Sequence, residues 1–127
     1  MAIQNEEHIW KLVDAKREEF IELSDRVFGT PETLYNEFCS VKEHIASLEI
    51  EGFKITKDVC GMPTAVIGEA GDEGPVIAIL GEFDALPGLS QEPGVASHSP
   101  MLDGGNGHGC GHNLLGSAAL LAATAVK

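Results

Sequence analysis

The stretch Val76-Ile77-Ala78-Ile79-Leu80-Gly81-Glu82-Phe83-Asp84 decides the fold class. Its first five residues are continuously apolar and rich in β-branched side chains, which is typical of a strand buried on both faces of an α/β sheet. We therefore predict a strand over 76–80, within a mixed sheet flanked by helices. Ligand sites in open α/β sheets lie beyond the carboxyl ends of strands. Glu82 and Asp84 stand at that place and are candidate site residues, with a pair of solvated loop acids as the alternative.

The stretch Asp103 to His112 alternates glycines with His108, Cys110 and His112. In an extended segment, residues two apart point the same way, so the three side chains could project from one side. Imidazole and thiolate are ligands that zinc and similar ions prefer, which favours a metal site. A carboxylate at the end of the preceding strand could ligate the same ion or orient a ligating histidine.

Three other interpretations of this glycine-rich stretch stay open. It could be a phosphate-binding loop before a helix, although its glycines do not follow GxGxxG and no Lys-Ser/Thr follows them. Cys110 could be a catalytic nucleophile, but a base two residues away in the same loop would reach it poorly. The plainest alternative is a structural cysteine beside two incidental histidines.

Periodicity places the remaining elements. Apolar residues at helical spacing predict one helix from about Glu6 to Phe28, stopped by Gly29. A second helix is expected to start with Thr30 as N-cap and Pro31 as first residue, and to close at Gly52. Cys39 and His44 on this helix are interpreted as packing or surface residues.

The second half of the chain is expected to begin with short strands and to end with a helix. The expected features are strands over 53–56 and 64–68, a turn over 71–74, a long surface loop over 90–106, and an apolar helix over 114–126 that Asn113 could cap. Small residues in that helix would allow close approach to a sheet: Gly116, Ser117, Ala118, Ala119, Ala122 and Ala123.

Composition limits the function classes. The 127 residues suffice for one small domain, and 43% apolar residues can form a core. A net charge of −12, without a basic cluster, argues against nucleic acid and anionic membranes as partners. Three widely spaced cysteines and a polar, acidic N-terminus predict a reducing, cytoplasmic location. The chain ends directly after the apolar helix without a cap, so we expect an N-terminal piece of a longer protein, truncated at its C-terminus.

Four stretches together resemble the M20 metallopeptidase and amidohydrolase family, in particular its aminoacylase-like branch, which includes aminobenzoyl-glutamate hydrolase B subunits and Xaa-Arg dipeptidase-like proteins. They are Pro31-Glu32 with Tyr35 and Glu37, Gly61-Met62-Pro63-Thr64-Ala65, Leu80-Gly81-Glu82-Phe83-Asp84-Ala85-Leu86-Pro87, and Gly107-His108-Gly109-Cys110-Gly111-His112-Asn113. The last two are the most specific, and their order and separation match the family. The resemblance spans nearly the whole chain but only the front part of a family member.

The resemblance implies that residues 1–127 are the N-terminal part of a metal-dependent hydrolase catalytic domain. Cys110 and His112 would be metal ligands, Asp84 matches the strand-end aspartate that supports the site, and Glu82 stands where many members have a His ligand or an Asp. His108 would be a neighbour rather than a ligand. The family's later Glu pair, which includes the general base, and its further histidines do not fall within these residues.

The implied reaction is metal-assisted hydrolysis of the amide bond of a small molecule, namely an N-acyl amino acid, aminobenzoyl-glutamate or a dipeptide. The complete protein would use zinc or manganese, as two ions, and could form a homo- or hetero-oligomer. Residues 1–127 alone are expected to hold metal weakly and not to catalyse. Two other classes stay open: a non-catalytic metal-binding or subunit-pairing module, and a hydrolase or redox sensor that works through Cys110.

Overall fold

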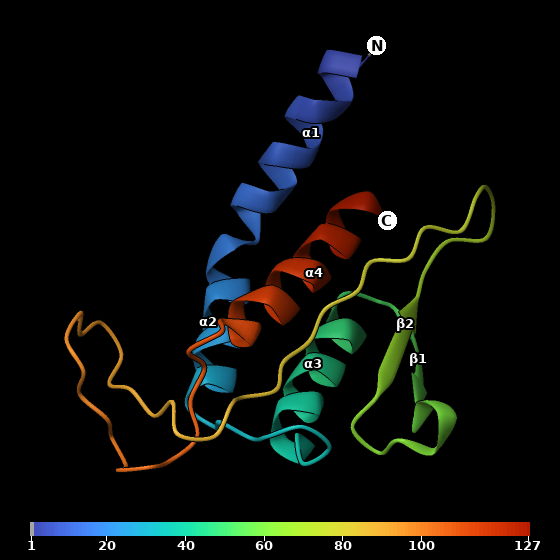
Figure 1. The fold of residues 1–127 in the computed structure, drawn as a ribbon. Helices are drawn as coiled ribbons and strands as arrows, with labels where there is room; N and C mark the ends of the chain where they lie inside the picture. Colours follow the sequence, from blue (N-terminus) through green and yellow to red (C-terminus); the bar gives the residue numbers. More distant parts are fainter. Residues whose placement is uncertain (1) are drawn as a thin grey trace.

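The computed structural model describes residues 2–127, which combine four α-helices with one two-stranded antiparallel sheet (Figure 1). In chain order the elements are α1 (Ala2–Ala15), α2 (Arg17–Phe28), α3 (Phe38–Ile50), β1 (Lys54–Lys57), a 3-10 turn (Val59–Gly61), β2 (Val66–Glu69) and α4 (His112–Val126). The predicted α/β class is confirmed only in that the chain combines α-helices with β-strands. No mixed sheet is present within residues 2–127.

The helix predicted over 6–28 is two helices, α1 and α2, separated by a turn at Lys16. The Lys16 amide is shared between the carbonyls of Leu12 and Val13, at 3.2 Å from each. Its Nζ donates a 2.6 Å hydrogen bond to the buried Glu51 carboxylate after α3. That bond raises the pKa of Lys16. The interruption therefore lies where Lys16 forms an ion pair with the residue that follows α3. Periodicity within one helix does not reveal a contact of this kind.

The predicted start of α3 at Pro31 is wrong by about two turns. Residues 31–37 form a loop, and the Glu32 carboxylate accepts hydrogen bonds from the amides of Cys39 and Ser40, both at 2.8 Å. Glu32 thus caps α3 from outside the helix, satisfying amides that have no partner within it. Thr30 does not cap α3, because its hydroxyl donates to the Arg26 carbonyl of α2. The predicted end at Gly52, where φ is +76°, is confirmed.

The two predicted short strands are confirmed, shifted by one or two residues from the expected ranges, and they pair as an antiparallel hairpin. β1 and β2 pair in register from Lys54 opposite Glu69 to Lys57 opposite Val66. A Cβ on Gly68 would lie 2.6 Å from Leu48 of α3. The glycine therefore allows the hairpin to lie directly on α3.

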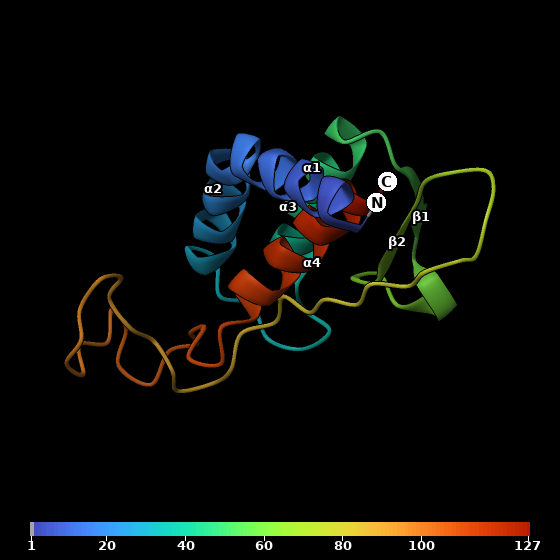
Figure 2. The same cartoon turned by 90° about the horizontal axis from the view of Figure 1, so that it is seen from above.

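The core lies where α2, α3 and α4 meet, and the hairpin covers one side of it (Figure 2). Its buried side chains are Phe20, Leu23, Val27, Leu48 and Leu120. The apolar helix predicted over 114–126 is confirmed as α4, and no helix within residues 2–127 has the length and apolar character needed to cross a bilayer. Asn113 does not cap α4. Its Nδ2 donates to Ser24 Oγ of α2 at 2.9 Å, and Gly111 occupies the N-cap.

The strand predicted over 76–80 is absent. The segment runs from the hairpin past α3 and α4 without strand pairing (Figure 1). Val76 is 98% exposed and Leu80 is 84% exposed. A strand must exchange backbone hydrogen bonds with a neighbour, and no described segment runs beside these residues as a strand. The apolar pattern is real, but its pairing partner is not among residues 2–127.

Candidate metal centre

Three of the residues singled out in the sequence converge in space. Glu82, Asp84 and His112 each offer one ligand atom, and these atoms lie within 4.8 Å of one another. Glu82 is exposed, whereas Asp84 and His112 are half-buried. The carboxylates follow the exposed apolar run, and His112 is the first residue of α4. The expected meeting of the two sequence stretches therefore takes place.

Asp84 holds the ring of His112 in a defined orientation. His112 Nδ1 lies 2.8 Å from Asp84 Oδ1 and 3.1 Å from the Asp84 backbone oxygen. A carbonyl oxygen only accepts hydrogen bonds, so Nδ1 carries a proton. In the neutral ring Nε2 then keeps its lone pair, and an Nδ1–H held by a carboxylate is the usual arrangement of a metal-binding histidine. A carboxylate oxygen and an imidazole nitrogen are among the ligands that divalent ions such as zinc accept in proteins.

The structure does not bring Cys110 and His108 into this group. The stretch over 108–112 is not extended, because Gly111 N donates to His108 O at 2.9 Å and closes a turn. Cys110 is consequently exposed on the turn and lies outside the group. The premise that the three side chains share one side of an extended segment is wrong.

His108 points into the protein instead. Its Nε2 lies 3.2 Å from the Val27 carbonyl and donates to it, while Nδ1 is buried without a partner among the described residues. Burial lowers the pKa of His108, and the hydrogen bond to Val27 opposes this only in part. The expectation that His108 is a neighbour rather than a ligand agrees with this placement.

Three loops that are distant in sequence are hydrogen-bonded side by side around the carboxylates. Ala85 N donates to Glu32 O at 2.7 Å, which gives a parallel bridge between Thr33 and Ala85. Leu86 and Gly107 exchange two 3.0 Å bonds. A Cβ on Gly107 would overlap the Leu89 backbone oxygen, so a glycine is required there. This small ladder fixes the segment after Asp84 to the glycine-rich stretch.

The segment over 81–83 is held between α3 and α4. The ring of Phe83 stacks on His44 of α3, with ring centres 4.5 Å apart and an angle of 27° between planes. His44 Nδ1 lies 3.0 Å from Ser40 O, and its Nε2 is buried without a partner among the described residues. Burial lowers the pKa of His44, so the ring is neutral. A Cβ on Gly116 of α4 would lie 2.7 Å from His44 Nε2 and 2.9 Å from Glu82 O.

His44 was interpreted as a packing or surface residue, and the structure shows packing, but its contact with the site was missed. The available signal was its position between Val41 and Leu48, on the apolar stripe of the helix. The close approach predicted for the small residues of α4 does occur. At Gly116 it is an approach to His44 and Glu82 rather than to a sheet.

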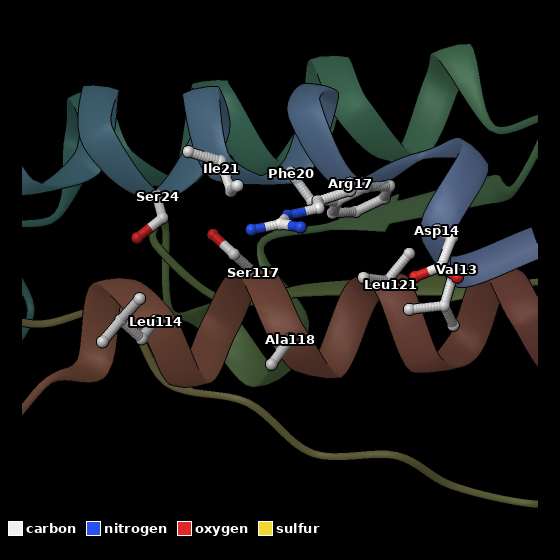
Figure 3. Close-up of a pocket in the computed structure, with 10 residues that line it drawn as sticks. All are labelled: Val13, Asp14, Arg17, Phe20, Ile21, Ser24, Leu114, Ser117, Ala118 and Leu121. Atoms are coloured by element: carbon white, nitrogen blue, oxygen red, sulfur yellow. The ribbon is translucent and has the colours of Figure 1, made fainter. Parts of the chain in front are cut away.

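An open groove of about 370 Å³ lies elsewhere, between the first two helices and α4 (Figure 3). Its walls are mostly apolar, with Phe20, Ile21, Leu114 and Leu121 among them. Neither Glu82, Asp84 nor His112 lines this groove. The candidate metal centre is therefore on a different part of the surface.

No family model matches the chain. The chain is 50% identical over 116 residues to the B subunit of p-aminobenzoyl-glutamate hydrolase from Escherichia coli (strain K12). The similarity covers 91% of this chain and 24% of that protein, so the chain spans about a quarter of the length of its curated relative. This similarity confirms the resemblance to aminobenzoyl-glutamate hydrolase B subunits that the motifs indicated: over nearly all of its length, the chain is a homologue of such a subunit.

Proposed function

We propose that residues 1–127 form the N-terminal part of the catalytic domain of a metal-dependent amide hydrolase. The observation that carries this proposal is the group of Glu82, Asp84 and His112, in which Asp84 fixes the proton of His112 on Nδ1. The 50% identity to one subunit of a hydrolase supports the same reaction class. The remaining ligands and the general base are proposed to lie outside these residues.

Each side chain has a proposed task at this centre. His112 would hold the ion through Nε2, and the exposed Glu82 carboxylate would complete the same side of the site. Asp84 would keep the ring of His112 oriented and keep the proton on Nδ1 of that ring. The exposed thiol of Cys110, two residues before His112, is proposed as a further ligand. When bound, zinc or manganese would activate water and polarise the scissile carbonyl.

The proposed substrates are amides of small carboxylic acids: an N-acyl amino acid, aminobenzoyl-glutamate or a dipeptide. The relative's name includes p-aminobenzoyl-glutamate, which makes that compound the first substrate to test. The relative is also named as one subunit of its hydrolase, so we propose that the complete protein assembles with itself or with a different subunit in the cytoplasm.

The test is hydrolysis of p-aminobenzoyl-glutamate by the complete protein, with and without a chelator, in wild type and in the variants Cys110→Ala and His112→Ala. Chelation and either substitution should abolish activity, and added zinc or manganese should restore only the wild type. His98→Ala is the matched control, because His98 is exposed in the long loop and should not affect hydrolysis.

Exposure of the Cys110 thiol gives a second candidate, a cysteine nucleophile. It predicts activity that survives the chelator and is lost only in Cys110→Ala, a result that would exclude the metal mechanism.

Isolated residues 1–127 should bind zinc weakly and should not hydrolyse the substrate. Robust turnover by this piece would contradict the proposed division of the site.

A further inference from the structure

We infer that His44, which is outside the Glu82, Asp84 and His112 group, is a positioning residue for that group and acts through Phe83. This role rests on the proposed metal centre, although the contacts of His44 and the test of its role require no metal. His44 lies in α3, is 4% exposed, and shares its apolar stripe with Val41 and Leu48.

A hydrogen bond within α3 orients the ring of His44 independently of its contact with Phe83. Because the Ser40 carbonyl can only accept, the neutral ring donates from Nδ1 to Ser40 O, and this 3.0 Å bond sets the plane of the ring. Phe83 then stacks on that plane with centres 4.5 Å apart. A stack of this kind depends on the orientation of both rings and not merely on buried area. The direction of Phe83 is thereby determined by α3.

The direction of Phe83 determines those of its two neighbours. In an unpaired extended segment, successive side chains point to opposite sides and residues two apart point to the same side. Phe83, held on His44, lies between Glu82 and Asp84 in the chain, and the carboxylates on either side of it converge on His112. Loss of the stack would free the segment to rotate and would separate the carboxylates from His112.

α4 fixes the same unit from the opposite side. Gly116 lies one turn after His112, and a Cβ there would collide with both His44 Nε2 and Glu82 O. One turn of α4 therefore sets the position of the His112 ring relative to His44 and to the Glu82 backbone. The buried Nε2 of His44 has no partner among the described residues, a cost that a purely apolar side chain at this place would not carry.

The test uses the tautomer of His112, measured by ¹⁵N NMR of its ring nitrogens in the full chain at pH 8.5. In wild type, the proton should be on Nδ1, because Asp84 accepts it. In His44→Ala and in the milder Phe83→Leu, most of that Nδ1–H population should be lost to Nε2–H. The control is Ile55→Ala, which removes a side chain packed on the core from the hairpin and should leave the wild-type tautomer in place.

Retention of the Nδ1–H tautomer in folded Phe83→Leu and His44→Ala would overturn the inference, and so would an equal change in Ile55→Ala. If His44→Ala does not fold, Phe83→Leu alone decides, because leucine keeps apolar volume and removes only the stack. A second measurement separates this inference from the proposed function: the zinc affinity of the complete protein, determined by calorimetry.

Affinity should fall about tenfold in Phe83→Leu, as it does when residues that orient metal ligands are changed, and should not change in Ile55→Ala. Absence of zinc binding in wild type would contradict the proposed function, and the tautomer measurement would still decide on His44. Unchanged zinc affinity in folded Phe83→Leu would contradict only the role of His44 and would leave the proposed function intact.

Discussion

Two continuous apolar runs in this chain have opposite fates. Residues 114–126 lie in α4, which buries one face containing Gly116, Leu120 and Thr124 against the other helices. Residues 76–80 are at least as apolar but are largely exposed, with Val76 at 98% and Leu80 at 84%. A helix satisfies its backbone hydrogen bonds within the segment, whereas a strand needs a neighbouring strand. An apolar pattern therefore predicts the structure of a helix more safely than that of a strand.

The largest expected contrast is between a leucine in each run. Leu120→Ala should reduce the free energy of unfolding by about 2–5 kcal/mol, because it leaves a cavity in the core. Leu80→Ala should change it by less than about 0.5 kcal/mol, because the side chain is already in solvent. Urea denaturation of both variants measures the difference. Equal losses would mean that the run over 76–80 is buried in solution.

The segment that follows the exposed run contacts α4 where Gly116 meets Glu82, and this contact gives the second prediction. In a free helix surface, Gly→Ala should stabilise by about 1 kcal/mol. Here the new Cβ would lie within 3 Å of His44 Nε2 and Glu82 O, so Gly116→Ala should instead destabilise by about 1–3 kcal/mol.

Ala122→Gly, at an exposed position of the same helix, serves as the control for helix propensity and should cost about 1 kcal/mol. Thermal unfolding followed by circular dichroism gives both values. A stabilised Gly116→Ala would show that the segment over 81–83 is free to move away from α4.

The third prediction concerns Glu32, which anchors the segment following the exposed run. Burial of Glu32 raises its pKa, but the amides of Ser40 and Cys39 and the Ser40 hydroxyl outweigh that effect, so the pKa is lowered in the folded state. A lowered pKa contributes stability above the unfolded value of about 4.3, and this contribution is lost as the pH falls through the folded value.

Glu32→Gln should therefore cost about 0.5–2 kcal/mol at pH 7, the range of a helix cap, and progressively less below about pH 4. Denaturation at several pH values measures this dependence. Glu49→Gln, at an exposed position of the same helix, should show no such loss. A cost for Glu32→Gln that is constant with pH would mean that its carboxylate is not the cap.

The sequence was informative where the determining contacts are local. The two short strands, the end of α3 at Gly52 and the apolar α4 follow from periodicity and turn residues, which act within a few positions. The start of α3 was missed because its cap, Glu32, lies outside the helix and six residues before Phe38. The strand over 76–80 was wrongly predicted for the opposite reason: its pattern is correct, but the partner it needs is not within residues 2–127.

The candidate site shows the same division. The convergence of Glu82, Asp84 and His112 was expected from their placement after an apolar run and before a helix, and it occurs. The common direction of His108, Cys110 and His112 was not found, because a turn closed by Gly111 separates them. The role of His44 depends on a contact between residues 39 positions apart, which spacing alone does not reveal.

The smallest expected change in stability, and the sharpest test of the comparison, is Val76→Lys in the exposed run. The side chain is 98% exposed, so the free energy of unfolding should change by less than about 0.5 kcal/mol. An unpaired apolar strand segment is, however, a template for pairing with another chain, and a lysine on it opposes that pairing. Sedimentation velocity over a range of concentrations should therefore show self-association of wild type that is reduced in Val76→Lys. Lys54→Ala, at an exposed position of β1 that is already paired, should associate like wild type. If Val76→Lys associates as strongly as wild type, the run over 76–80 is not the pairing surface, and its exposure does not generate the association.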